Sequence, residues 1–88
     1  MERLANLGPK SAAMLERAGI TSKEDIRRLG SVRCYLQLKR AGENASLNLL
    51  WALEGFISGK RWQDVAREDR LWLLNELERL NSVDRNSR

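Results

Sequence analysis

Apolar side chains recur at helical spacing along most of the chain, and most densely near its middle. Leu47, Leu50, Leu53 and Ile57 repeat at intervals of three or four residues. Other apolar residues between them widen this stripe until it covers most of the helix surface. A helix that is apolar nearly all round lies inside a protein. The pattern therefore predicts a central, buried helix over residues 47–57.

Turn-forming and capping residues bound the other predicted helices. A cap at Thr21-Ser22 faces Glu24 or Asp25 across a first turn, close to a capping box. Ser31 and Ser46 are the predicted N-caps of the two helices that follow. Glycine suits a helix end in the left-handed conformation, and three glycines follow apolar stripes: Gly19, Gly30 and Gly59. The predicted helices span residues 9–18, 23–29, 32–40, 47–57 and 67–81.

The last predicted helix follows a link over residues 60–66. Glu68 and Asp69 are expected in its first turn, where carboxylates oppose the positive end of the helix dipole. Its inward stripe is predicted to be Leu71, Leu74, Leu77 (or Glu78) and Leu80. No segment alternates β-branched and polar residues as a strand does. We therefore predict an all-α fold, a compact bundle of about five short helices forming one domain over residues 1–81, with a polar, disordered tail over 82–88.

The composition argues against catalysis. The chain has 88 residues, which is room for one domain and one core but not for a deep substrate pocket. It has no histidine, which removes the commonest general base and the commonest metal ligand. Cys34 is its only cysteine, so no internal disulfide can form. We expect no enzyme activity, no cofactor and no bound metal.

The chain also lacks the signals of a membrane or secreted protein. No apolar run approaches the roughly 18 residues that a membrane-spanning helix requires. The N-terminal sequence MERLANLGPK lacks the basic-then-apolar order of a signal peptide. We therefore expect a soluble, cytoplasmic protein that does not contact membranes.

Positive charge is concentrated in the first half of the chain. Residues 1–45 carry nine Lys and Arg against five acidic residues, whereas residues 46–88 carry seven of each. The net charge of +4 therefore comes from the first half. Such a half attracts a polyanion or the acidic face of a protein. The alternative is that these cations form an ordinary solvated surface.

The turn before the first helix is the sharpest candidate site. Asn6, Leu7 and Gly8 run into Pro9, which suits the first position of a helix. Backbone N–H groups at a helix start are unpaired and lie at its positive end, so they can bind a phosphate while Lys10 supplies a charge. The alternative is a structural turn that only joins two packed helices.

A second candidate is a basic face on the next two helices. Lys23 and Arg27 lie four residues apart on the first of them, and Arg33 and Arg40 lie on one stripe of the second. Together they would follow a phosphate backbone or an acidic protein surface. The alternative is an exposed face whose charge is partly neutralised by neighbouring acids.

The aromatic and polar residues of the second half give two further expectations. Helical spacing favours packing roles for the three tryptophans, but Trp62 follows Lys60-Arg61 and is the one expected to contact a partner. Glu54 lies within the most apolar helix, where a buried carboxylate must be paired. Arg61 or Arg70 are its predicted partners, in a network that fixes the fold.

Three segments carry a resemblance to a known family. Residues 4–20, LANLGPKSAAMLERAGI, are similar to the second half of a helix-hairpin-helix. The segments SKEDIRRLGSVRCYLQLKRAG and SLNLLWALEGFISGKRWQDVARED complete a match to the C-terminal domain of the TfoX/Sxy family over about residues 4–80. Its most specific pieces are NLGPKS, SLNLL and ALEG. One departure is that Asn6 stands where the hairpin of DNA-binding members of the helix-hairpin-helix class usually has glycine.

The resemblance implies a fold and a function. It implies a helix-hairpin-helix-like N-terminal part and a role in competence and DNA transformation, alongside the cyclic-AMP receptor protein. Longer members of the family carry an α/β domain ahead of this one. We therefore expect a non-catalytic regulatory domain that contacts the transcription machinery. The alternative is a sequence-independent module that binds double-stranded DNA.

Overall fold

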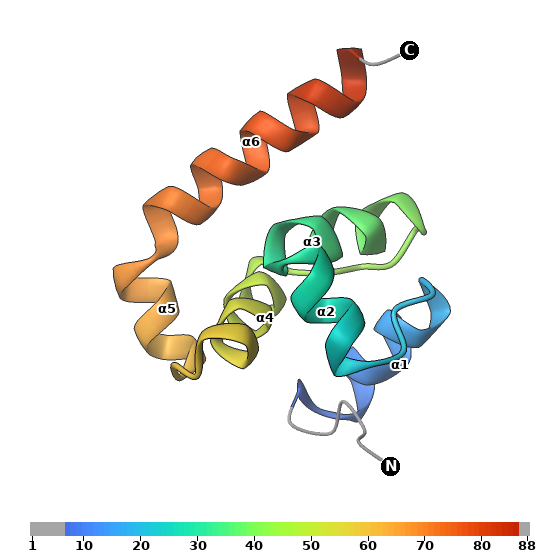
Figure 1. The fold of residues 1–88 in the computed structure, drawn as a ribbon, viewed down its shortest axis with the longest axis horizontal. Coiled ribbons are helices and arrows are strands. Elements are labelled where there is room, and N and C mark those ends of the chain that lie inside the picture. The colour runs from blue at the N-terminus through green and yellow to red at the C-terminus, as the bar shows by residue number, and fades with distance from the viewer. Residues whose placement is uncertain (1–6, 87–88) are drawn as a thin grey trace.

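The fold is built from six helices. The computed structural model describes residues 7–86 and the side chains of residues 7–82. Over these residues it contains no strand, so the all-helical prediction is confirmed (Figure 1). The predicted count of about five is one short, because the link expected over residues 60–66 holds a helix of its own. The helices are α1 (Pro9–Arg17), α2 (Lys23–Leu29), α3 (Ser31–Arg40), α4 (Leu47–Ser58), α5 (Trp62–Glu68) and α6 (Arg70–Asn86).

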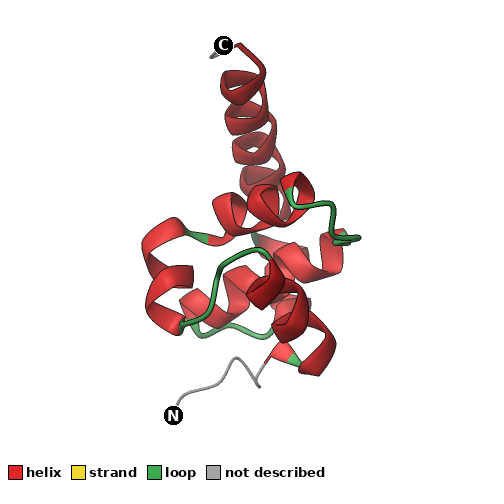
Figure 2. Cartoon of the chain, turned by 90° about the vertical axis from the view of Figure 1, so that its right-hand side faces the viewer, coloured by secondary structure: helices red, strands yellow, loops and turns green. Residues whose placement is uncertain are grey.

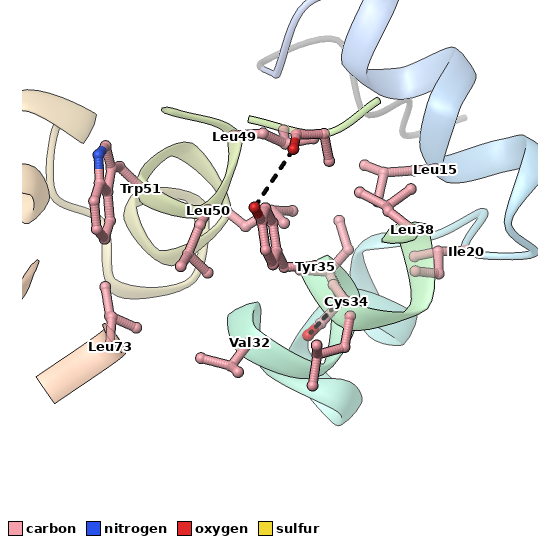
Figure 3. Close-up of a cluster of buried hydrophobic side chains, with 14 of the residues drawn as sticks. Leu15, Ile20, Val32, Cys34, Tyr35, Leu38, Leu49, Leu50, Trp51 and Leu73 are labelled. Carbon is pink, nitrogen blue, oxygen red and sulfur yellow. Dashed lines mark hydrogen bonds between the residues drawn. The ribbon is translucent and has the colours of Figure 1, made fainter. Parts of the chain in front are cut away.

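Helix α4 is the centre of the core, as its apolar pattern predicts. It packs against α2, α3 and α5. Leu50 and Leu53 are fully buried, and Trp51 is nearly so. Figure 3 shows Leu50 beside Tyr35 of α3, and Trp51 facing Leu73 of α6. Burying a leucine side chain stabilises the folded chain by about 2 kcal/mol, so this helix holds the bundle together.

Helix α1 ends in the left-handed turn that the sequence predicts. Gly19 has a φ of 86°, a value that side chains with a Cβ rarely adopt. Its N–H donates to the carbonyl oxygen of Glu16 at 3.0 Å, and the N–H of Ile20 donates to that of Leu15 at 2.8 Å. This is the Schellman pattern, and it places Ile20 in the core, where it is fully buried.

The predicted cap of α2 is confirmed. The Ser22 hydroxyl accepts a hydrogen bond from the Asp25 N–H at 3.1 Å, and the Asp25 carboxylate accepts one from the Thr21 N–H at 3.2 Å. These exchanged bonds satisfy two backbone donors at the helix start. The Thr21 N–H, and after it the Arg28 guanidinium, hold the pKa of Asp25 below its ordinary value.

The two other predicted serine caps have different outcomes. Ser31 is the first residue of α3 rather than its N-cap, and its hydroxyl donates to the Glu54 carboxylate at 2.7 Å. Ser46 is the N-cap residue of α4, as predicted, although its side chain makes no capping hydrogen bond. Ser31 and Glu54 meet across the α3–α4 contact. Glu54 is therefore hydrogen-bonded to a serine, rather than paired with Arg61 or Arg70 as predicted. It is also only half buried.

The chain after α4 differs most from the prediction. Helix α5 occupies the expected link, so Glu68 closes α5 and Asp69 lies at its end instead of opening the last helix. Lys60 binds both carboxylates, at 3.3 Å to Glu68 and 3.1 Å to Asp69. Gly55 lets this link pass close to α4, since a Cβ on it would lie 2.6 Å from the Lys60 carbonyl oxygen. The ion pairs of Lys60 and the close approach of its backbone to Gly55 therefore set the path of the link between α4 and α5.

Helix α6 packs through most of the predicted stripe: Leu74, Leu77 and Leu80 face the core, but Leu73 takes the place predicted for Leu71. Leu73 and Leu80 are buried, whereas Leu71 is 74% exposed. The run LWLLNELERL offers apolar residues on two sides of the helix, and the contact of α6 with α3 selects the side of Leu73. Residues 82–86 are helical where a polar tail was expected, and α6 extends out of the body of the domain (Figure 2). No helix in the described range 7–86 is both long and apolar enough to cross a membrane.

Candidate interaction groove

The turn before α1 lies at the rim of a surface groove. Gly8 has a φ of 91°, Pro9 opens the helix, and the first turn of α1 has neither a side-chain cap nor an acidic residue. Leu7 is half buried and Lys10 is exposed. Asn6, the first residue of the predicted turn, lies outside the described residues. The start of α1 therefore presents a lysine and the positive end of the helix to this rim.

The groove consists of two adjoining hollows. One, of about 620 Å³, lies between α1, the α3–α4 loop and α4, and its lining includes Lys10, Met14, Arg17, Glu43 and Leu49. The other, of about 500 Å³, lies between α2, α4 and the start of α5, and its lining includes Lys23, Arg27, Phe56, Lys60 and Arg61. Leu7, Ala52 and Trp62 line both hollows, which makes them one continuous surface. We call this surface the basic groove.

The second half of the basic groove is cationic. Of the residues that the structure describes, four lysines and arginines line it and no aspartate or glutamate does. The Arg27 guanidinium lies 5.9 Å from the centre of the Phe56 ring, in a cation–π contact. The two acidic partners of Lys60 raise the pKa of its ammonium group. Arg61 lies 3.6 Å from the Asp64 carboxylate, a long contact that leaves its side chain 78% exposed.

Among the described residues, the first half holds one carboxylate, that of Glu43, and an arginine neutralises it. Arg17 of α1 makes two hydrogen bonds to Glu43 of the α3–α4 loop, at 2.9 and 2.8 Å. This two-pronged contact is the strong geometry for an arginine and a carboxylate. It ties α1 to the loop and holds the pKa of Glu43 below its ordinary value of 4.5.

This ion pair predicts an acid-dependent loss of stability. Because Arg17 lowers the pKa of Glu43 in the folded chain, the contribution of the pair is complete above pH 4.5 and is lost as the pH falls through the folded-state pKa. Wild-type stability should therefore fall more steeply below pH 4.5 than that of Glu43→Gln, measured by urea unfolding at several pH values. Parallel curves for the two proteins would contradict this role. Asp25 and Glu76 titrate in both proteins and cancel in the difference.

The predicted basic face is divided between two sides of the molecule. Lys23 and Arg27 of α2 line the basic groove together with Lys10. Arg33 and Arg40 of α3 instead line a small hollow with Leu80 of α6. Spacing within one helix cannot predict how the next helix is turned, and the break at Gly30, with a φ of 86°, separates α2 from α3. Lys60 and Arg61 line the basic groove instead of Arg33 and Arg40.

The three tryptophans have different environments. Trp51 is buried in the core, as its spacing predicts, whereas Trp62 is 46% exposed at the first turn of α5. Trp72 is also exposed, at 49%, but it lies on α6 outside the basic groove. The exposure expected for Trp62 is thus observed, and its contact with a partner stays a prediction. The signal that could have placed Lys60 and Arg61 here was their position directly before Trp62.

Cys34 belongs to the core. It is fully buried, and burial raises the pKa of its thiol to about 12. The thiol therefore stays protonated and unreactive at neutral pH. Over the described part of the chain, no three His, Cys, Asp or Glu side chains gather as metal ligands.

The fold and the groove together define a small, all-helical domain with a groove lined by lysines and arginines. The chain belongs to the TfoX family: the family model of the TfoX C-terminal domain matches residues 1–77, as the resemblance predicted. The chain is 29% identical over 77 residues to the DNA transformation protein TfoX of Haemophilus influenzae. The match covers 88% of this chain and 36% of that relative, so the chain spans about a third of the relative's length. No solved structure matches the chain.

Proposed function

We propose that this chain is a non-catalytic regulatory domain for DNA transformation that binds a protein of the transcription machinery through the basic groove. The observation that carries the proposal is the exposed Trp62 set between cations from α1, α2 and the α4–α5 link. Tryptophan and arginine are the residues that most often dominate protein–protein binding. The domain acts in the cytoplasm, where transcription takes place.

The cyclic-AMP receptor protein is the partner that the family resemblance implies. The Haemophilus influenzae relative is a DNA transformation protein by name. A domain that acts through another regulator needs a surface for protein contact and no reaction centre. The mixture of apolar and basic side chains in the groove supports such a contact, because the buried centre of a protein interface is apolar and its rim is polar.

Duplex DNA binding is the second candidate function. It is favoured by the start of α1, where an exposed Lys10 lies beside an uncapped first turn. In this interpretation α1 is the second helix of a helix-hairpin-helix. Phosphate oxygens would accept hydrogen bonds from the backbone at the turn, without regard to base sequence.

Charge reversal in the groove tests the protein-binding function. The double variant Arg27→Glu/Arg61→Glu should weaken binding to the cyclic-AMP receptor protein by about tenfold or more, measured by calorimetry and by pull-down. Arg70→Glu/Arg79→Glu is the matched control, since it makes the same charge change at two exposed positions outside the groove, and it should leave binding unchanged. Absence of binding both by this chain and by a two-domain relative would refute the proposal.

Binding assays with duplex DNA distinguish the DNA-binding function from the protein-binding function. Duplex binding should appear at low salt and fall steeply as salt rises, because released counterions drive it. Lys10→Glu should then weaken binding to DNA strongly. No duplex binding at micromolar protein and low salt would eliminate this candidate.

A further inference from the structure

The floor of the basic groove is apolar and its cations stand on both sides of that floor. Leu7, Ala52 and Trp62 form the stretch shared by the two hollows. Lys10 lines only the hollow beside α1, whereas Arg27 and Arg61 line only the hollow beside α2. A ligand that occupies the whole groove therefore meets an apolar centre between two positive ends.

Only some of the lining cations are available to a ligand. Lys60 is held by Glu68 and Asp69, which offset its charge. Arg27 lies over the Phe56 ring, an arrangement that leaves the N–H groups in the plane of the guanidinium able to bind a carboxylate. Arg61 has an exposed side chain with one long ion contact.

In the other half, the only carboxylate among the described lining residues is that of Glu43, and Arg17 neutralises it. Within residues 7–86, Lys10 is therefore not opposed by an unpaired acid of the groove. Both ends of the groove keep positive charge for a bound anion.

We infer that the basic groove binds a short acidic segment of the partner protein, with one large apolar side chain packed on Trp62 and carboxylates reaching the cations on either side. This inference rests on the proposed function, because it names the chemistry of the surface through which the partner is bound. Apolar contact sets the position of the segment, and the flanking charges speed its association and select acidic partners.

The apolar floor favours a peptide over a nucleic acid. A DNA duplex presents phosphates on a convex surface and keeps its bases inside, so it has nothing to bury against Leu7 and Ala52. A single strand has free bases that stack on an exposed tryptophan. The experiment therefore includes a single-stranded probe.

The test uses two labelled peptides and one oligonucleotide. The first peptide has six Asp and Glu residues around a central Phe and Leu, and the second has Ser in place of both apolar residues. The third probe is an oligothymidylate of similar length. Fluorescence anisotropy at low salt should show that the Ser peptide binds about tenfold more weakly than the first peptide, and that oligothymidylate does not displace the first peptide.

Two tryptophan variants provide a matched comparison. Trp62→Ala should weaken binding of the first peptide by about tenfold or more, and Trp72→Ala, at a similarly exposed position outside the groove, should change it by less than about twofold. Trp62→Phe keeps an aromatic ring and should retain most of the affinity. This second variant gives the answer if circular dichroism shows that Trp62→Ala is poorly folded.

Several results would overturn the inference. Equal binding of the two peptides would mean that charge alone attracts them, and equal effects of the two alanine variants would place the contact outside the groove. Displacement by oligothymidylate would assign the groove to single strands.

If the peptide binds but the cyclic-AMP receptor protein does not, the proposed function fails and the groove chemistry stands. If the receptor binds wild type and Arg27→Glu/Arg61→Glu equally and the peptide does not bind, the groove chemistry fails and the regulatory contact stands.

Discussion

Replacing Leu73 with alanine is expected to lower the free energy of unfolding by about 3 kcal/mol. Leu73 is fully buried, and it joins α6 to the core through its contact with Trp51 (Figure 3). The substitution removes most of an apolar side chain and leaves a cavity that neighbouring helices fill only in part. In a domain of this size the midpoint of thermal unfolding should fall by about 10 °C or more. Urea and thermal unfolding followed by circular dichroism measure both quantities.

Leu71→Ala is the matched control for this prediction. Leu71 lies two residues earlier on the same helix and is 74% exposed, so its loss should change the free energy of unfolding by less than about 0.5 kcal/mol. Equal effects at the two positions would mean that α6 packs through the other side. The comparison therefore tests the rotation of α6 about its own axis.

Gly55→Ala is expected to destabilise the domain, although alanine favours a helix more than glycine does. In an unobstructed helix interior the change would stabilise the fold by about 1 kcal/mol. Here the new Cβ would lie 2.6 Å from the Lys60 carbonyl oxygen, which belongs to the backbone and cannot rotate away. We expect a net loss of about 1–3 kcal/mol, typical of an overpacked interior. Urea unfolding measures it.

The same substitution should also disturb the basic groove. Moving the α4–α5 link shifts Lys60, Arg61 and Trp62, so groove ligands should bind more weakly to Gly55→Ala. Asn48→Ala on the same helix is the stability control, because Asn48 is exposed and alanine there should stabilise by a few tenths of a kcal/mol. A stabilised Gly55→Ala would show that the link does not pass close to α4.

Local sequence signals predicted the first four helices well. The left-handed Gly19 and the exchanged hydrogen bonds of Ser22 and Asp25 depend only on residues a few positions apart. The density of apolar residues around Leu50 identified the central helix for the same reason. Such interactions are present whatever the rest of the chain does.

Predictions that needed a distant partner were wrong. Ser31 looks like a cap in the sequence, but Glu54, 23 residues away, takes its hydroxyl. The link after α4 lacks an apolar stripe of its own, and α5 forms there with Val65 buried in the core and α4 packed alongside. Both errors have the same cause. Whether a short helix forms, and which group a single hydroxyl bonds to, depends on the tertiary neighbours, which are distant in the sequence.

The sequence by itself determined that this protein is all-helical, that residues 47–57 are its centre, and that it belongs to the TfoX family, because helical periodicity and family motifs are properties of neighbouring residues. Only the tertiary structure decided which cations share a surface. In the folded chain Lys10, Arg27 and Arg61 lie around Trp62, whereas Arg33 and Arg40 lie beside α6. The physical reason is that residue spacing fixes directions within one helix, whereas packing of the core fixes how each helix is turned relative to the next.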